Sequence, residues 1–257
     1  MGALAGKVYV VEEVFAFLIV FARVGSIFML MPGISEMAVS PRIRLTLALL
    51  VAGLLTPLVS AGLPPVPAGL PALLFVLGRE ILIGIVLGTL IRLFVSALQI
   101  AGTAIAMQTG LGFVQSVDPT QGTQGALVAT FLTILGTTLV LATDLHLMMI
   151  AAVHDSYSLF PAGADLPLDD VVALAQRMVS GAYALGMAIA APFLIFGLLF
   201  YFAMGILSRL MPQLHVFFLA MPLNILLSFA ILSILIGTLM VMYLDAFEAH
   251  LARFLAG

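Results

Sequence analysis

Four charged residues inside long apolar stretches are the first candidates for chemistry in this sequence. They are Arg23 in the first stretch and Arg79, Glu80 and Arg92 in a later one. A charge at membrane depth is costly, so it usually lies in a pair or beside a water-filled path. These residues therefore indicate either an ion or proton pathway or an internal ion pair. Adjacent helical residues point about 100° apart, so Glu80 is expected to neutralise Arg23 or Arg92 rather than its neighbour.

A second cluster of titratable residues lies in DLHLMMIAAVHD, residues 144–155. On one helix, His146 and His154 would be about 12 Å apart along the axis, which is too far for one metal ion to bind both. A zinc-binding HExxH motif needs a four-residue spacing. The sequence also has no GxSxG, phosphate-loop or dinucleotide-binding motif. We therefore expect a protein that is not an enzyme and that holds no metal ion and no cofactor.

The composition determines the medium in which these residues must work. The chain has 257 residues, of which 63% are hydrophobic and only 8% are charged, whereas soluble domains average about 25% charged residues. Lipid or other protein must cover much of its surface, which predicts an integral membrane protein. The net charge is −3 and the basic residues are scattered, so we expect no binding of nucleic acid.

Polar, glycine and proline residues divide the chain into six apolar segments, which predict an all-α, polytopic membrane protein. Ser40 and Pro41 form a typical helix start, with a capping hydroxyl and a proline at the first helical position. The segments run roughly over 4–31, 41–59, 71–108, 125–159, 168–208 and 213–255.

Several of these segments are too long for straight membrane helices. At about 1.5 Å per residue, residues 125–159 would span roughly 50 Å, against a hydrocarbon core of about 30 Å. Tilting absorbs only part of this excess. We therefore expect at least two long segments to be bent or broken, with Pro192 and Pro222 as candidate helix breaks.

One long polar stretch separates the third and fourth segments. Residues 110–125 read GLGFVQSVDPTQGTQG, with four glycines and a single charge. Connectors between helices are usually shorter, and long loops are often functional. The stretch is thus either a functional loop or an ordinary connector.

Four motifs in the same order resemble those of one family, the flagellar biosynthetic proteins of the FliR type, which belong to type III secretion export gates. The resemblance covers nearly the whole chain, whereas each motif alone would be weak. Its parts are ARVGSIFMLMPGISEMAVSPRIRLTLAL (22–49), EILIGIVLG (80–88), MQTGLGFVQSVDP (107–119) and MPQLHVFFLAMPL (211–223).

This resemblance implies a non-enzymatic core subunit of the flagellar protein export gate, which helps to form and close a channel for unfolded substrates. It implies a single domain over 1–257, made of broken helical hairpins, with a FliP-like part to about residue 208 and a FliQ-like hairpin over about 209–257. The implied partners are FliP- and FliQ-like subunits, FlhA and FlhB. The implied location is the bacterial inner membrane, within the flagellar basal body.

The resemblance also implies a role for the polar stretch, because the family's central loop is thought to plug the closed pore. Phe113, Val114 and Val117 of this loop would block the lumen, and its glycines permit a non-helical backbone. The implied plug residues are Gly110, Leu111, Gly112, Phe113, Val114, Gln115, Ser116, Val117, Asp118 and Pro119.

Two other functions stay open at this point. A secondary transporter for a small solute would use broken helices at Pro192 and Pro222 around a midplane site. A membrane enzyme would need catalytic groups on facing helices, which the sequence does not offer. The transporter would be stable as a monomer, whereas an export subunit would depend on its partners.

Overall fold

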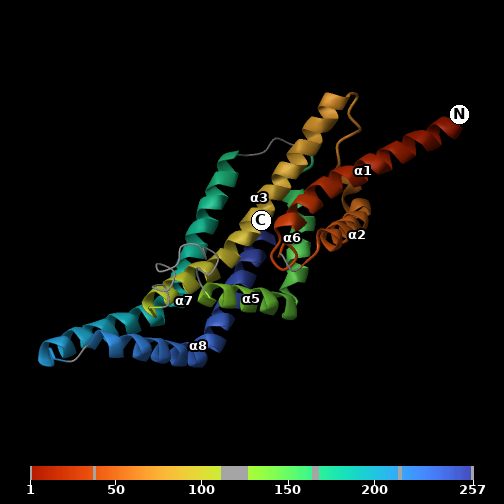
Figure 1. Cartoon of the computed structure of the whole chain (residues 1–257). Coiled ribbons are helices and arrows are strands. Elements are labelled where there is room, and N and C mark those ends of the chain that lie inside the picture. The colour runs from red at the N-terminus through yellow and green to blue at the C-terminus, as the bar shows by residue number, and fades with distance from the viewer. Residues whose placement is uncertain (1, 37–38, 111–126, 164–167, 214–215, 256–257) are drawn as a thin grey trace. The chain divides into compact units, whose positions relative to one another are not determined.

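The chain is α-helical throughout the part that the structure, a computed structural model, describes: residues 2–36, 39–110, 127–163, 168–213 and 216–255. No strand occurs within these ranges, which confirms the predicted all-α class. The helices, shown in Figure 1, are α1 (Gly2–Leu30), α2 (Pro41–Val59), the short 3-10 helix η1 (Ser60–Gly62), α3 (Leu70–Gln108), α5 (Leu127–Ala142), α6 (Leu145–Leu159), α7 (Leu168–Leu210) and α8 (Val216–Leu255).

The helix boundaries follow from local sequence signals. The Ser40 hydroxyl accepts a hydrogen bond from the Ile43 amide at 3.4 Å, and Pro41 occupies the first turn of α2, as predicted. The predicted segment 125–159 is interrupted at Asp144, whose φ of 60° is incompatible with a right-handed helix. Among the described residues, this is one of the at least two bent or broken segments that the sequence predicts.

The other long segments form single helices of 39, 43 and 40 residues. These lengths correspond to roughly 58, 64 and 60 Å. Pro192 lies inside α7 and Pro222 lies inside α8, so neither proline ends a helix. A proline removes one helical hydrogen bond, and the flanking turns here continue on both sides of that loss. A local kink at either residue stays a prediction.

The helices pack into two compact units that interleave along the sequence. Unit 1 contains residues 1–93, 141–176 and 250–257, and unit 2 contains residues 94–140 and 177–249. The long helices α3, α7 and α8 therefore each contribute to both units. The predicted division of the chain near residue 208 rests on resemblance to other proteins and not on internal contacts. It stays a prediction.

Close helix contacts in both units depend on glycine. In unit 1, a Cβ atom on Gly84 of α3 would lie 2.6 Å from the carbonyl oxygen of Arg23 on α1. In unit 2, a Cβ atom on Gly102 would lie 2.2 Å from the Cα atom of Ala129 on α5. Any side chain at these positions would push the helix backbones apart, so glycine sets the helix spacing there.

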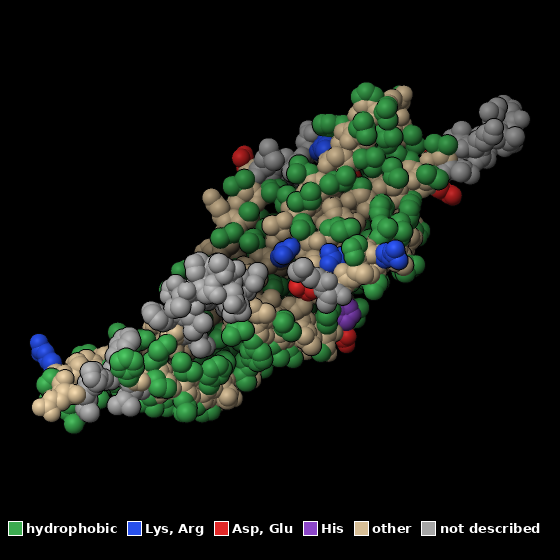
Figure 2. Space-filling view, viewed as in Figure 1, with side chains coloured by type: hydrophobic (Ala, Val, Ile, Leu, Met, Phe, Trp, Pro, Cys, Tyr) green, Lys and Arg blue, Asp and Glu red, His purple; other side chains and the backbone are tan. Residues whose placement is uncertain are grey.

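The described surface is strongly apolar. Among the described residues, five helices are long and apolar enough to cross a membrane, or six spans if α5 and α6 together form one. Hydrophobic side chains are spread over the whole length of the face seen in Figure 2, and charged side chains are few. Leu54, Leu198 and Ile234 are each more than 70% exposed. This confirms the prediction of a polytopic membrane protein, because water alone would not solvate such a surface.

Candidate functional site

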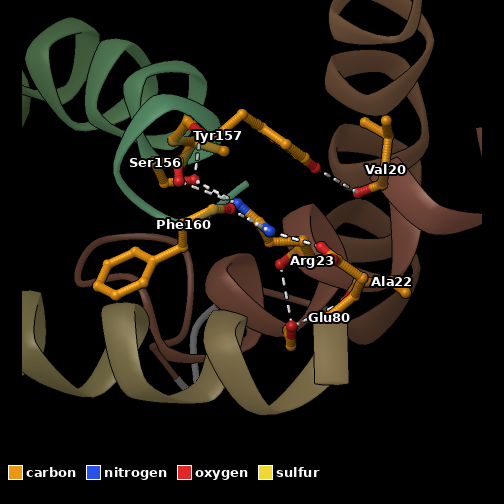
Figure 3. A network of polar contacts seen from close by, with 9 residues as sticks. Val20, Ala22, Arg23, Glu80, Ser156, Tyr157 and Phe160 are labelled. Atoms are coloured by element: carbon orange, nitrogen blue, oxygen red, sulfur yellow. Dashed lines mark hydrogen bonds and ion pairs between the residues drawn. The ribbon is translucent and has the colours of Figure 1, made fainter. Parts of the chain in front are cut away.

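The buried ion pair between Arg23 and Glu80 is the centre of a polar network in unit 1. Arg23 lies on α1 and Glu80 on α3, and both side chains are completely inaccessible to solvent. The Arg23 Nε atom donates to the Glu80 Oε2 atom at 2.6 Å, as Figure 3 shows. The predicted pairing of Glu80 with an arginine is thus confirmed, and the partner is Arg23.

The rest of the Arg23 guanidinium binds the end of α6. Its Nη1 atom donates to the carbonyl oxygen of Ser156 at 3.0 Å, and Nη2 donates to that of Phe160 at 2.9 Å. Carbonyl groups at the C-terminal end of a helix carry partial negative charge, which favours a cation there. The guanidinium is therefore neutralised from two sides, by a carboxylate of α3 and by a helix end (Figure 3).

Tyr157 completes the network from α6. The Arg23 Cζ atom lies 4.0 Å from the centroid of the Tyr157 ring, a cation–π contact. The Tyr157 hydroxyl donates to the carbonyl oxygen of Val20 on α1 at 3.5 Å. Side chains from α1, α3 and α6 thus meet at one point.

This arrangement supports a structural role for the network rather than proton transfer. An arginine does not release its proton in proteins. Its guanidinium is also fixed by one carboxylate and two carbonyl groups. The remaining Glu80 oxygen, Oε1, has no hydrogen-bond partner among the described residues. A buried pair of this kind tolerates the loss of one member badly, because the other charge stays behind without compensation.

The other two predicted charges lie outside this network. Arg79 is half-buried, and its Nη1 atom donates to the Gly163 carbonyl oxygen at 3.3 Å. Arg92 is exposed, so the expectation that it is buried is wrong for the described chain. The reason is the helical period: Arg92 follows Glu80 by twelve residues, which rotates it by about 120° away from the Glu80 face.

Most of the predicted plug lies outside the described residues. This applies to Leu111 through Pro119, whereas Gly110 is described. Gly110 lies two residues after the end of α3 and has a φ of +78°. Glycine in this left-handed conformation commonly ends a helix. The predicted start of the loop therefore coincides with the end of α3.

A contact that the sequence interpretation missed lies at this same end of α3, in unit 2. Asn224 of α8 is only 2% exposed, and its Nδ2 atom donates to the carbonyl oxygen of Gln108 at 3.0 Å. The sequence did offer one signal for this contact, because an amide side chain inside an apolar segment needs a hydrogen-bond partner.

The histidines of the 144–155 cluster lie apart from the Arg23 network. The His154 Nδ1 and Asp155 Oδ1 atoms are 2.7 Å apart on the exposed face of α6. Within the described ranges, no three His, Cys, Asp or Glu side chains are placed to hold one metal ion.

Comparison with known proteins gives one consistent family. The model of the bacterial export proteins, family 1, matches residues 14–250. The flagellar biosynthetic protein FliR of Caulobacter vibrioides is 41% identical over 242 residues, covering 94% of this chain and 96% of that protein. The FliR protein of Pectobacterium carotovorum is 31% identical and covers 84% and 82%. The surface presentation of antigens protein SpaR of Shigella flexneri is 25% identical and covers 89% of each chain.

Proposed function

The chain belongs to the bacterial export proteins, family 1, and we propose that it is a non-enzymatic core subunit of the flagellar type III export gate. The observation that carries this proposal is the 41% identity to a FliR protein over nearly the full length of both chains.

The physical character of the chain supports a subunit that works inside an assembly. Helices of 39 to 43 residues exceed the thickness of a bilayer core, yet their exposed side chains are apolar along much of their length. Apolar surface that extends beyond lipid needs cover from other proteins. FliP- and FliQ-like subunits, FlhA and FlhB are the partners we propose, in the inner membrane at the flagellar basal body.

The proposed function of residues 110–119 is to close the export channel until a substrate enters. The stretch begins at Gly110, two residues after the end of α3. Phe113, Val114 and Val117 supply apolar bulk, and the uncharged polar residues avoid the cost of burying a charge without a partner. Unfolded flagellar subunits are the proposed cargo.

Co-purification from native membranes tests this function. The full-length chain, carrying an affinity tag and expressed from its own locus, is extracted in mild detergent and isolated. We expect FliP- and FliQ-like proteins in a stable complex of defined mass. A monodisperse, well-behaved monomer without them would contradict the proposal and favour a solute transporter. An unrelated polytopic membrane protein with the same tag serves as the control for non-specific association.

A further inference from the structure

The outward face of α2, in unit 1, is a continuous row of apolar side chains. Among the described candidate spans, the one that contains α2 has the smallest buried share, 17%. The row follows the three- and four-residue spacing of one helix face, and its members are between 37% and 72% exposed. They are Ile43, Leu47, Leu50, Leu54 and Leu58. Such a row needs cover from lipid or from another protein.

The length of α2 favours lipid as the cover for this row. Its 19 residues span about 28 Å, which matches a hydrocarbon core of about 30 Å. The helices α3, α7 and α8 are about twice as long. A single helix of bilayer length can present its whole outward face to acyl chains, from one headgroup region to the other.

Contacts within unit 1 show which parts of its helices lie at the same level. A Cβ atom on Gly53 of α2 would lie 4.0 Å from the Phe17 ring, so α2 runs back along α1. A Cβ atom on Gly88 of α3 would lie 2.8 Å from the Leu30 Cβ atom. The end of α1, the start of α2 and the part of α3 just after Gly88 are therefore level with one another.

Three arginines lie at this level. Arg42 and Arg44 are near the start of α2, and Arg92 is one turn beyond Gly88 on α3. Arg42 and Arg92 are exposed, and within the described ranges neither side chain has a hydrogen-bond or ion-pair partner. The half-buried Arg44 donates from Nη2 to the Glu36 carbonyl oxygen at 2.5 Å. Basic side chains form a row across the middle of the face in Figure 2.

Helix stability does not account for basic residues at the start of α2. The N-terminal end of a helix carries partial positive charge, which disfavours a cation there. The first turn of α2 contains no acidic residue that would compensate Arg42 and Arg44. The other end of the apolar row is different, because residues 59–71 contain no charged residue at all. The positive charge is therefore placed at one end of the row only.

Nearby acidic residues leave these arginines unpaired. Glu36 is exposed in the turn between α1 and α2. Asp144 is exposed three residues after Leu141, whose side chain would lie 3.2 Å from a Cβ atom on Gly33. Neither carboxylate forms an ion pair with an arginine in the part of the chain that the structure describes. The guanidinium groups are thus available to an anion from outside the chain.

We propose that this face of unit 1 binds an anionic phospholipid. Its headgroup lies beside Arg42, Arg44 and Arg92, and an acyl chain follows the apolar row of α2. A guanidinium group binds phosphate through paired N–H donors, and an anionic headgroup attracts basic residues near the membrane surface. This inference goes beyond the proposed function and does not depend on it, because contacts within unit 1 alone carry it.

A lipid titration tests the headgroup preference. The full-length chain is purified from native membranes in a nonionic detergent, together with its partners, and is titrated with phosphatidylglycerol that carries a fluorescent acyl chain. Phosphatidylcholine with the same label reports the apolar contribution, and anisotropy follows both. We expect Arg42→Gln/Arg92→Gln to lower the preference for phosphatidylglycerol about 30-fold, because each basic residue near an anionic surface contributes roughly fivefold.

Matched variants separate the site from net charge. Arg177→Gln/Arg209→Gln removes the same charge from two exposed arginines of α7 in unit 2, so the preference should not change. Arg42→Lys/Arg92→Lys retains the charge and should keep most of the preference. All three variants should assemble as wild type on a native gel, because the replaced side chains are exposed.

The apolar row has its own variant. Leu50→Ser/Leu54→Ser removes two of its most exposed leucines. This change should weaken the binding of both lipids severalfold and leave their ratio unchanged, since the headgroup contacts stay in place. Unchanged binding of both lipids would contradict the placement of an acyl chain on α2.

The remaining outcomes distinguish this inference from the proposed function. Equal affinity of the wild type for the two lipids, or an equal loss of preference in the α7 control, would overturn the inference. Loss of an export partner from Arg42→Gln/Arg92→Gln would also overturn it, because the arginines would then face a protein. Failure of the wild-type chain to co-purify with export partners would refute the proposed function, whereas the lipid titration of the purified chain would still test the site.

Discussion

The buried charge of Arg23 is stabilised by three groups that lie far from it in the sequence. Its environment is therefore the easiest one to disturb by mutation. Glu80 neutralises its charge, while Ser156 and Phe160 accept from its two terminal nitrogens. The Ser156 and Phe160 acceptors are backbone carbonyls, which remain when the side chain is changed. The Glu80 acceptor belongs to a side chain, so an apolar replacement there leaves a buried cation without its carboxylate.

Replacing Glu80 tests this environment. Glu80→Ala removes the only carboxylate paired with Arg23 among the described residues, and we expect a loss of about 3–5 kcal/mol in stability. Glu80→Gln keeps a carbonyl that can accept from Arg23 Nε, so it should lose less. The measurement is the yield of assembled complex on a native gel. Arg92→Ala, at an exposed charge of the same helix, is the control. Equal, wild-type yields for both Glu80 variants would show that the buried charge is incidental.

For single residues, the sequence predicted that the buried charges are paired better than it predicted which charges are exposed to solvent. The pairing of Glu80 followed from the cost of charge in an apolar segment. The choice of Arg23 over Arg92 did not follow, because it depends on which helices become neighbours. The acceptors on Ser156 and Phe160 are backbone carbonyls, which no residue type reveals. Asn224 was visible as a polar residue, but its partner is again a backbone carbonyl.

Among the helices, the approach of α1 to α3 is set by glycine. Gly84→Ala would place a methyl group 2.0 Å from the Ser26 Oγ atom and 2.6 Å from the Arg23 carbonyl oxygen. We expect a loss of about 1–3 kcal/mol from overpacking. Gly78→Ala on the same helix meets no atom within 4 Å. It should be neutral or stabilising by up to about 1 kcal/mol, because alanine favours helix.

Thermal unfolding of the purified complex, followed by circular dichroism, compares these two variants. The prediction requires a lower midpoint for Gly84→Ala than for Gly78→Ala. Matching midpoints would mean that α1 and α3 can move apart at no cost, and that the close contact at Gly84 is not a determinant of packing.

The loop after α3 is testable as an element of its own. Deleting Phe113–Val117 removes three of its four large apolar side chains and spares Leu111, the glycines and Asp118-Pro119. We expect normal assembly, because the flanking helices supply the packing, but a raised leak of small ions through the closed gate. Asp118→Ala should do less, since one side chain does not fill a pore. Ion leak in cells with the complete gate is the measurement. A deletion that assembles and leaks no more than wild type would favour an ordinary connector.

Helix existence was predictable from the apolar segments, but helix continuity was not. Periodicity and length identified the segments, and Ser40 and Pro41 marked the start of α2. The interruption at Asp144 could not be predicted, because no proline or glycine marks it in the sequence. Aspartate tolerates the left-handed conformation but does not require it. Conversely, Pro192 and Pro222 look like breaks in the sequence, yet the helix continues around them because one lost hydrogen bond is a small fraction of a 40-residue helix.

For the whole molecule, the composition was enough to predict a membrane protein, but the division into two compact units came only from the structure. A charged fraction of 8% requires lipid or protein cover, whatever the fold. Composition and motif order do not reveal that α3, α7 and α8 are shared between two compact units. Within a unit, contacts join residues more than a hundred positions apart, as with Gln108 and Asn224 in unit 2.

The wide sequence separation of the Arg23 contacts has a consequence for biosynthesis. A ribosome adds about 5–20 residues per second, so Glu80 is synthesised roughly 3–11 s after Arg23. Ser156 and Phe160 follow Arg23 by 133 and 137 residues, a delay of roughly 7–27 s at the same rate. During this interval α1 carries a cation whose final neighbours do not yet exist. The order of translation therefore makes the carboxylate the first group that can receive Arg23 and the end of α6 the last.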